Sequence, residues 1–290
     1  MTTIGVVSPG ALGAALGRAW AAGGARVVAT VAGRSPRTRS LARGIELLPG
    51  LEDVVAVSDL VASICPPGVA REVADAVCRV IEKAVHAGRR PVYADLNAVA
   101  PTTVEAVAAR VAAAGMPFVD GAVSGGPPRP GGDTMLYLSG DRAAWLAGLP
   151  ADGLRRRVVG DRPGTASAVK MCTASVYKGT TALWAQALQT AQHHGVLDVV
   201  LDDLGEEFPE AVSGAGRRIA TSASKAARFV GEMEEIALTQ GAAGASPELF
   251  EAMAAVYARL ARTPLAALTP EEAHTADDLE DVLSQLARDA

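Results

Sequence analysis

The sequence predicts an α/β fold in which an N-terminal doubly wound sheet is followed by an all-helical C-terminal domain. Up to about residue 163, apolar runs of strand length alternate with helical segments, as in a parallel sheet covered by helices. Beyond Gly164, the stretch at about 165–194 contains no proline and is typical of one long helix, and every later segment also favours helix. We therefore expect two domains, 1–163 and 164–290, with this long interdomain helix opening the second.

The first forty residues predict a βαβ unit. Thr3–Val7 is an apolar run, Ala14–Ala22 is a helix of small residues, and Val27–Ala32 is a second apolar run. The turn between the first strand and the helix matches the dinucleotide-binding fingerprint G-x-G-x-x-G, with serine in place of the first glycine. Glycines also cluster in other strand-to-helix turns, but this order of elements favours a Rossmann-like domain. The residues expected to hold the cofactor here are Ser8, Pro9, Gly10, Ala11, Leu12 and Gly13.

The residues after the second strand indicate which dinucleotide binds. An NAD site usually carries an acidic residue there for the ribose 2′-hydroxyl, but Met1 to Ile45 contains no Asp or Glu. Guanidinium groups suit the geometry of a 2′-phosphate, so we expect NADP(H) rather than NAD. The alternative is a solvated, basic start of a helix. The residues assigned to this subsite are Gly33, Arg34, Ser35 and Arg37.

Further strands and helices extend the alternation to Val159. Ligands of such sheets bind at the carboxyl ends of the strands, where Cys65, Pro66, Pro67 and Asn97 are expected to border the cofactor. The expected strands are 61–65, 91–96, a strand starting at 117–120, 135–138 and 156–159, and the expected helices are 69–85, 101–114 and 142–149. Later helices are expected to begin at Ser246-Pro247-Glu248 and at Thr269-Pro270, where Thr269 and Glu272 form a capping box.

Composition excludes several classes of protein. The chain has 290 residues, is 49% hydrophobic and carries a net charge of −5, which argues against a general nucleic-acid binder. It contains no apolar run of membrane-spanning length, and its N-terminus is typical of a strand rather than a signal peptide. We expect a cytoplasmic protein with neither nucleic acid nor membrane as a partner.

The cysteines and histidines predict no metal site. Cys65, Cys78 and Cys172 are widely spaced and are expected to be buried thiols. His86 and the other histidines lack metal-ligand spacing, and the pair His193-His194 is expected to end the long helix.

Three motifs in this order resemble the β-hydroxyacid dehydrogenases related to 6-phosphogluconate dehydrogenase. They are the N-terminal G-V-V-S-P-G-A-L-G, the loop Asp120-Gly121-Ala122-Val123-Ser124-Gly125-Gly126, and Gly164 followed by Lys170. The resemblance covers about residues 3 to 195. It implies hydride transfer between a nicotinamide cofactor and a carbon that bears an alcohol or a ketone.

The resemblance also implies roles for individual residues. Lys170 matches the family's acid/base, which exchanges a proton with the substrate oxygen. Ser124, Gly125 and Gly126 match the substrate anchor, and a hydroxyl with two flexible backbone amides suits a carboxylate. Arg129 either adds charge to this loop or is a solvent-facing arginine, and the second is the more ordinary interpretation.

The chain departs from the family at three positions. Ala122 stands where members have proline, and Ala174 stands where they usually have the asparagine that binds substrate. Thr173, Tyr177 and Lys178 are therefore candidates for the missing substrate contact. The third departure is Asn97, where members often have serine; it either faces the nicotinamide carboxamide or is an ordinary helix N-cap before Pro101.

The function expected from all of this is that of an NADP-dependent oxidoreductase acting on a small anionic hydroxy acid or its keto form. One alternative is an NADPH-dependent imine reductase, since a related branch has the same architecture but commonly carries Asp or Tyr at the lysine position. Another is a non-catalytic NADP-binding sensor or interaction protein, whose helical half would bind a protein partner. The resemblance implies a homodimer built by the helical domain, which is also expected to contribute to substrate binding. The acidic residues Glu232, Glu234 and Glu235 either reach the substrate cleft or form a solvated helix face, and the solvated face is the more ordinary interpretation.

Overall fold

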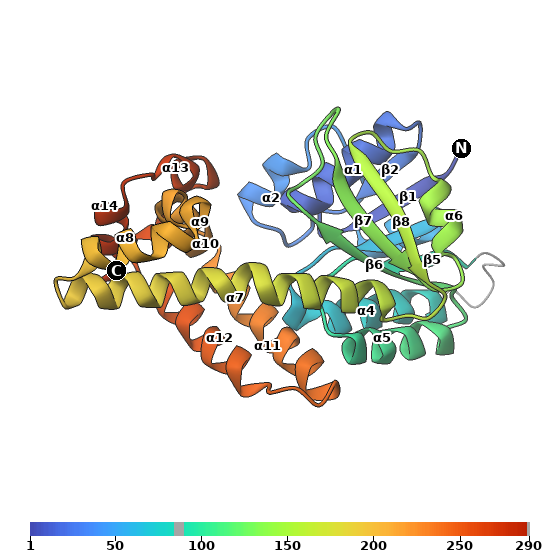
Figure 1. Cartoon of the computed structure of the whole chain (residues 1–290). Coiled ribbons are helices and arrows are strands. Elements are labelled where there is room, and N and C mark those ends of the chain that lie inside the picture. Colours follow the sequence, from blue (N-terminus) through green and yellow to red (C-terminus); the bar gives the residue numbers. More distant parts are fainter. Residues whose placement is uncertain (84–89, 289–290) are drawn as a thin grey trace. The chain divides into compact units, whose positions relative to one another are not determined.

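The computed structural model describes residues 1–83 and 90–288 of the chain. The chain divides into two compact units, residues 1–171 and 172–290 (Figure 1). The division falls eight residues after the expected boundary at 163, so the first turns of the long helix belong with the N-terminal unit.

The described strands of the N-terminal unit form an eight-stranded sheet with the order β3-β2-β1-β4-β5-β6-β7-β8. Neighbouring strands run parallel except β6 and β7, which form an antiparallel pair in which Ser124 lies opposite Met135. The strands are β1 (Thr3–Val7), β2 (Arg26–Ala29), β3 (Glu46–Leu47), β4 (Leu60–Ser63), β5 (Val92–Asp95), β6 (Phe118–Ser124), β7 (Thr134–Ser139) and β8 (Leu154–Gly160). This is the predicted Rossmann-like doubly wound sheet, and it is confirmed.

Helices cover both faces of the sheet, and each face has its own apolar core. On one face, Leu16 and Trp20 of α1 and Leu146 of α6 pack against alternate strand residues. On the other face, which α4 and α5 cover in Figure 1, Val77 and Val107 belong to the second core. The helices are α1 (Ala11–Ala22), α2 (Pro36–Leu41), α3 (Leu51–Val57), a 3₁₀ turn η1 (Pro67–Val69), α4 (Ala70–Lys83), α5 (Pro101–Ala113) and α6 (Ala143–Gly148).

Several boundaries differ from the prediction. The first helix begins at Ala11 rather than Ala14, because Gly10 takes the N-cap position. The second strand ends at Ala29, three residues early. The helix expected at 69–85 is a 3₁₀ turn followed by α4, and residues 84 and 85 lie outside the described residues. The short elements α2, β3 and α3 were not predicted.

The C-terminal unit contains helices throughout its described residues. The predicted long helix is α7 (Thr165–His193), and the capping box at Thr269 and Glu272 opens α13 as expected. The helices after α7 are α8 (Leu197–Glu207), α9 (Pro209–Ser213), α10 (Ala215–Ala223), α11 (Ala226–Ala242), α12 (Glu248–Leu260), a 3₁₀ turn η2 (Pro264–Ala267), α13 (Pro270–Thr275) and α14 (Leu279–Leu286). Among the described residues, no helix combines the length and apolarity needed to cross a membrane.

Candidate functional site

The turn between β1 and α1 has the geometry of an anion-binding site. Ser8 has a φ of +67°, so it adopts the left-handed conformation that the first fingerprint glycine would allow. A Cβ atom on Gly13 would lie 2.6 Å from the Ser8 carbonyl oxygen, which explains why glycine is needed there. A Cβ atom on Gly10 would meet nothing within 4 Å, so space remains over the start of α1. The N-cap Gly10 provides no side-chain hydrogen bond, and the first-turn amides of α1 can bind phosphate oxygens.

The loop after β2 presents two arginines at the start of a second helix. Gly33 has a φ of +67°, and the Ser35 hydroxyl caps α2 by accepting the N–H of Thr38 at 3.2 Å. Arg34 and Arg37 are both exposed, and the Arg34 carbonyl accepts the Arg39 Nε at 3.2 Å. On the adjoining strand, the Glu46 carboxylate is bound to Arg26. The loop therefore combines positive charge with a helix N-terminus, both of which suit a phosphate group.

A polar cluster links the carboxyl ends of β4 and β5. The Asn97 side-chain oxygen accepts the backbone N–H of Cys65 at 2.6 Å, and its amide nitrogen donates to Ser63 Oγ at 3.2 Å. Asn97 is 3% exposed, and the N-cap of α5 is Ala100, so the helix-cap interpretation of Asn97 is wrong. Burial raises the pKa of the Cys65 thiol to about 11, while a hydrogen bond with Ser63 and the charge of Arg34 act in the opposite direction. The charge of Asp95 also raises this pKa, so Cys65 is a thiol at neutral pH.

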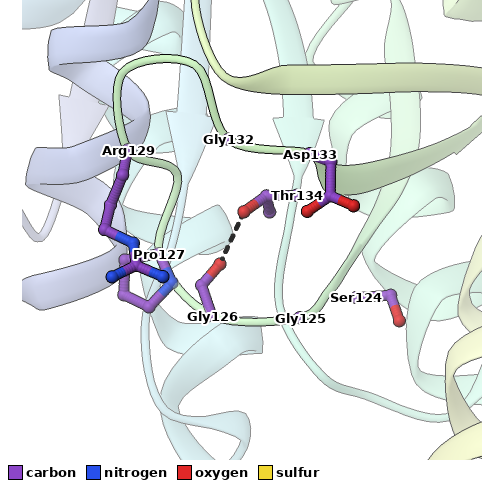
Figure 2. A pocket seen from close by; sticks show the side chains of 8 residues that line it. All are labelled: Ser124, Gly125, Gly126, Pro127, Arg129, Gly132, Asp133 and Thr134. Atoms are coloured by element: carbon purple, nitrogen blue, oxygen red, sulfur yellow. Dashed lines mark hydrogen bonds between the residues drawn. The ribbon is translucent and has the colours of Figure 1, made fainter.

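The loop between β6 and β7 surrounds a hollow of about 320 Å³ (Figure 2). Ser124, Gly125 and Gly126 line it, and Gly125 has a φ of +99°. The Thr134 hydroxyl donates to the Gly126 carbonyl at 3.0 Å and closes the loop. Figure 2 shows Arg129 beside Pro127, whereas Asp133, which sequence reasoning missed, lies on the opposite arm of the loop. The hollow is thus lined by glycines and by side chains of both signs of charge.

The start of α7 is attached to the sheet by a buried carboxylate. Asp120 on β6 accepts the backbone N–H groups of Gly164 at 2.9 Å and Ser167 at 3.0 Å. It also accepts the Ser167 hydroxyl at 2.7 Å and the Ser139 hydroxyl at 2.9 Å. Lys170, which is half-buried, follows Ser167 by three residues and so lies one helical turn further along. Asp120 belongs to the motif that resembles the family, but the sequence alone assigns it no role.

The other substrate candidates lie in the C-terminal unit. Thr173 is half-buried, and the Tyr177 side chain is 72% exposed. The Lys178 ammonium forms an ion pair with Glu232 and lies 4.2 Å from the centre of the Phe229 ring. Its charge is therefore already matched within this unit.

The interpretation of the acidic cluster as a solvated face is wrong for one of its three members. Glu232 is 5% exposed, and besides Lys178 it contacts Arg228 Nε at 3.2 Å. Glu234 is exposed and Glu235 is half-buried. The buried carboxylate faces inward because two cations neutralise it.

The remaining cysteine and histidine predictions have mixed outcomes. Cys78 is buried and Cys65 is half-buried, but Cys172 is exposed, so the expectation of three buried thiols is wrong for Cys172. His193 is the last residue of α7. His86 lies outside the described residues. Within the parts of the chain that the structure describes, no group of three or more His, Cys, Asp or Glu side chains could hold a metal ion.

Comparison with protein families gives two matches. Residues 3–150, just over half of the chain, match the NAD binding domain of 6-phosphogluconate dehydrogenase. Residues 191–260 match DUF1932, a domain of unknown function. The matched N-terminal region contains the β1–α1 turn, the arginine loop after β2 and the hollow at the β6–β7 loop.

Individual relatives agree with these matches. An uncharacterized 28.5 kDa protein of Methanothermus fervidus is 28% identical over 178 residues, which span 61% of this chain and 66% of that protein, slightly less than two thirds of its length. The solved structure of the conserved protein MTH1747, of unknown function and described as structurally similar to 3-hydroxyacid dehydrogenases, is 30% identical. The match covers 89% of this chain and 96% of that one, with a TM-score of 0.65.

Two structures below 25% identity show the same fold. The 3-hydroxyisobutyrate dehydrogenase of Mycobacterium tuberculosis, solved with L-serine, is 22% identical over 99% of this chain and 100% of that chain, with a TM-score of 0.67. A Streptomyces aurantiacus imine reductase is 24% identical over 98% of this chain and 99% of that chain, with a TM-score of 0.52.

Proposed function

Because the chain belongs to the family defined by the NAD binding domain of 6-phosphogluconate dehydrogenase, we propose that it is an NADP-dependent oxidoreductase acting on a small anionic hydroxy acid or its keto form. The observation that carries this proposal is the pair of phosphate-binding features at one edge of the sheet. One is the open turn at Gly10, and the other is the loop with Arg34 and Arg37 after β2.

The cofactor preference rests on charge. Arg34, Ser35 and Arg37 would bind the 2′-phosphate of NADP(H), and Gly33 gives the loop its left-handed turn. The first-turn amides of α1, from Ala11 to Gly13, would bind the pyrophosphate. Pro66, Pro67 and the Asn97 side chain, which lie at the carboxyl ends of β4 and β5, would border the nicotinamide half of the cofactor.

In the proposed reaction the bound nicotinamide supplies or accepts the hydride. Lys170 donates a proton to the substrate oxygen in reduction and accepts it in oxidation. Ser124 and the amides of Gly125 and Gly126 hold the substrate anion. Thr173 is the remaining candidate for a neutral polar contact, whereas Lys178 would have to exchange its Glu232 partner to bind substrate.

One observation favours a second function. Asp133 places a carboxylate at the hollow beside Gly126, and a carboxylate would attract the positive charge of a protonated cyclic imine. An NADPH-dependent imine reductase is therefore the second candidate. A non-catalytic NADP-binding sensor would bind the cofactor without turnover, and replacing Lys170 would leave that binding unchanged.

The cofactor proposal is tested by titrating the purified protein with NADPH and with NADH. Replacement Arg34→Ala should weaken NADPH binding about 10- to 100-fold, because it removes a charge-assisted contact. NADH binding should change less than about twofold, since NADH has no 2′-phosphate. Arg43→Ala, another exposed arginine of the same region, is the control and should alter neither affinity. Tighter binding of NADH than of NADPH by the parent protein would contradict the assignment.

We also propose that the C-terminal unit forms a homodimer. Val176, Tyr177 and Leu183 are 65%, 72% and 62% exposed on α7, and Val176 and Leu183 are two turns apart on one face. Apolar side chains aligned in this way are typical of an interface. Sedimentation should show a dimer at micromolar concentration and dissociation in Leu183→Glu. A monomeric parent would contradict this proposal.

A further inference from the structure

The buried carboxylate of Asp120 receives four hydrogen bonds, and they come from two separate parts of the N-terminal unit. Two come from backbone N–H groups at the start of α7, one from the Ser167 hydroxyl and one from Ser139 on β7. Ser139 Oγ in turn accepts the N–H of Ala166 at 3.1 Å. Asp120 and Ser139 are both 0% exposed, and Ser167 is 1% exposed. The first turn of α7 is thus capped by side chains of the sheet.

The backbone around this cluster is shaped to make these contacts. The pairing of β7 with β8 shifts between Leu138 and Ser139, so that Ser139 lies opposite Gly160. Gly164 has a φ of +94°, and a Cβ atom on it would lie 3.3 Å from Pro101 Cβ at the start of α5. A bulge and a left-handed glycine therefore bring the β7 end and the α7 start to the same carboxylate.

Burial of a carboxylate at this position costs free energy, which its hydrogen bonds offset. Burial raises the pKa of Asp120, whereas its hydrogen bonds with Ser167, Ser139 and Gly164 lower it. Helix starts are usually capped by local Ser, Thr, Asp or Asn side chains, which hold the helix to its own loop and not to a distant strand. Here the cap is 47 residues away from Ser167 in the sequence. Such a cap fixes where the helix begins relative to the sheet.

We propose that Asp120, with Ser139, is a positioning residue that fixes the first turn of α7 to the sheet and thereby sets the location of the Lys170 ammonium. The proposal rests on the proposed function insofar as Lys170 is the acid/base. The helix transmits the constraint directly, because Lys170 is three residues beyond Ser167 and four beyond Ala166, on neighbouring turns. Displacement of this start would move the Lys170 side chain without touching cofactor or substrate.

The test compares Asp120→Asn, Ser139→Ala and Ser167→Ala with Ser58→Ala. Ser58 is also 1% exposed, and its hydroxyl donates a hydrogen bond to the Val54 carbonyl at 2.6 Å, at the end of α3 in the same unit. The matched control thus removes one buried hydroxyl and leaves the α7 start intact. The serine variants keep the experiment decisive where Asp120→Asn does not fold.

Two readouts are measured on each variant. The first readout is the kinetic constants kcat and KM, together with the affinity for NADPH. The second is the NMR titration of Lys170 after reductive ¹³C-methylation, which is resolvable because the chain has only four lysines, Lys83, Lys170, Lys178 and Lys225. Assignment uses Lys170→Arg. The second readout needs no substrate.

We expect Asp120→Asn, Ser139→Ala and Ser167→Ala to lower kcat about 10- to 100-fold, the effect of a displacement near 1 Å. They should also change the chemical shift and the titration midpoint of Lys170. NADPH affinity should be unchanged, and Ser58→Ala should leave both readouts at the parent values. Values of kcat and of the Lys170 titration equal to those of the parent in Ser167→Thr, which keeps the hydroxyl, would support the proposal further. A Lys170 titration that is identical in all variants and the control overturns it. If the parent turns over no hydroxy or keto acid, the proposed function fails, and the NMR titration still decides the positioning role.

Discussion

The carbonyl oxygen of Ser8 lies where a side chain on Gly13 would have to fit, since a Cβ atom there would come within 2.6 Å of it. The left-handed φ of Ser8 turns this carbonyl toward the start of α1, and its oxygen accepts the N–H of Gly10 at 2.8 Å. The two residues therefore fix the shape of the turn, while Gly10 between them remains open. Ser8 and Gly13 thus determine the fold of the turn, whereas Gly10 leaves space for a ligand over the start of α1.

Replacement of the two glycines should have different consequences. Gly13→Ala should lower the free energy of unfolding by about 1–3 kcal/mol, because the added methyl group meets a backbone atom that cannot move aside. Gly10→Ala should change it by less than about 1 kcal/mol, since the space is empty and only the N-cap preference is affected. Gly10→Ala should nonetheless weaken NADPH binding about tenfold or more, because the methyl group occupies the approach of the pyrophosphate to the backbone.

Urea unfolding and NADPH titration of the same preparations check this prediction. Equal NADPH affinity in Gly10→Ala and the parent would show that no phosphate lies over this turn.

The serine at the first fingerprint position should be less favourable for stability than glycine. A non-glycine residue in the left-handed region costs about 1–2 kcal/mol, and the extra chain entropy of glycine offsets about 0.5–1 kcal/mol of the gain. Ser8→Gly should therefore raise the free energy of unfolding by about 0.5 kcal/mol. Ser35→Gly is the control, because Ser35 has a φ of −60° and caps α2, so its replacement should lower stability by a few tenths of a kcal/mol. Urea unfolding measures both, and a less stable Ser8→Gly would contradict the strain at Ser8.

The rate at which Cys65 is alkylated should show whether NADPH binds next to it. At pH 8, iodoacetamide should modify the exposed Cys172 quickly and Cys65 slowly, because thiolate is the reactive form and the pKa of Cys65 is raised to about 11. The rate at Cys65 should rise as the pH increases toward that pKa. Saturating NADPH should slow the reaction at Cys65 and leave Cys172 unaffected. Peptide mass spectrometry measures both rates, and a lack of protection by NADPH would remove Cys65 from the proposed cofactor site.

The features that sequence reasoning predicted are those that local residues determine. The β1–α1 turn, the long helix α7 and the capping box at Thr269 are set by residues within a few positions of one another. The alternation of strands and helices likewise predicted the Rossmann-like, doubly wound class of the sheet, but not its strand order. The two-residue β3 and the six-residue α2 were missed because elements that short leave no periodic pattern.

Side-chain partners that are distant in sequence could not be predicted. The Asp120 carboxylate receives donors 19, 44 and 47 residues away, and the burial of Glu232 depends on Lys178, 54 residues away. The Asn97 side chain was expected either at the cofactor or at a helix start; it does not cap α5, and it joins the ends of β4 and β5. These contacts depend on tertiary packing, and only the folded chain brings the partners together.

We propose that this chain transfers hydride between NADP(H) and a hydroxy or keto acid, with Lys170 as the acid/base. The most direct measurement is nicotinamide absorbance over time, with NADP or NADPH and a panel of 3-hydroxy acids, their keto forms and cyclic imines. Turnover of an acid or keto acid should fall about 10²- to 10⁴-fold in Lys170→Ala, as expected for loss of a general acid/base. Full turnover by Lys170→Ala would contradict the assignment of Lys170. Turnover of imines alone would establish the second candidate function, and NADPH binding with no turnover of any compound would contradict the dehydrogenase account in favour of a sensor.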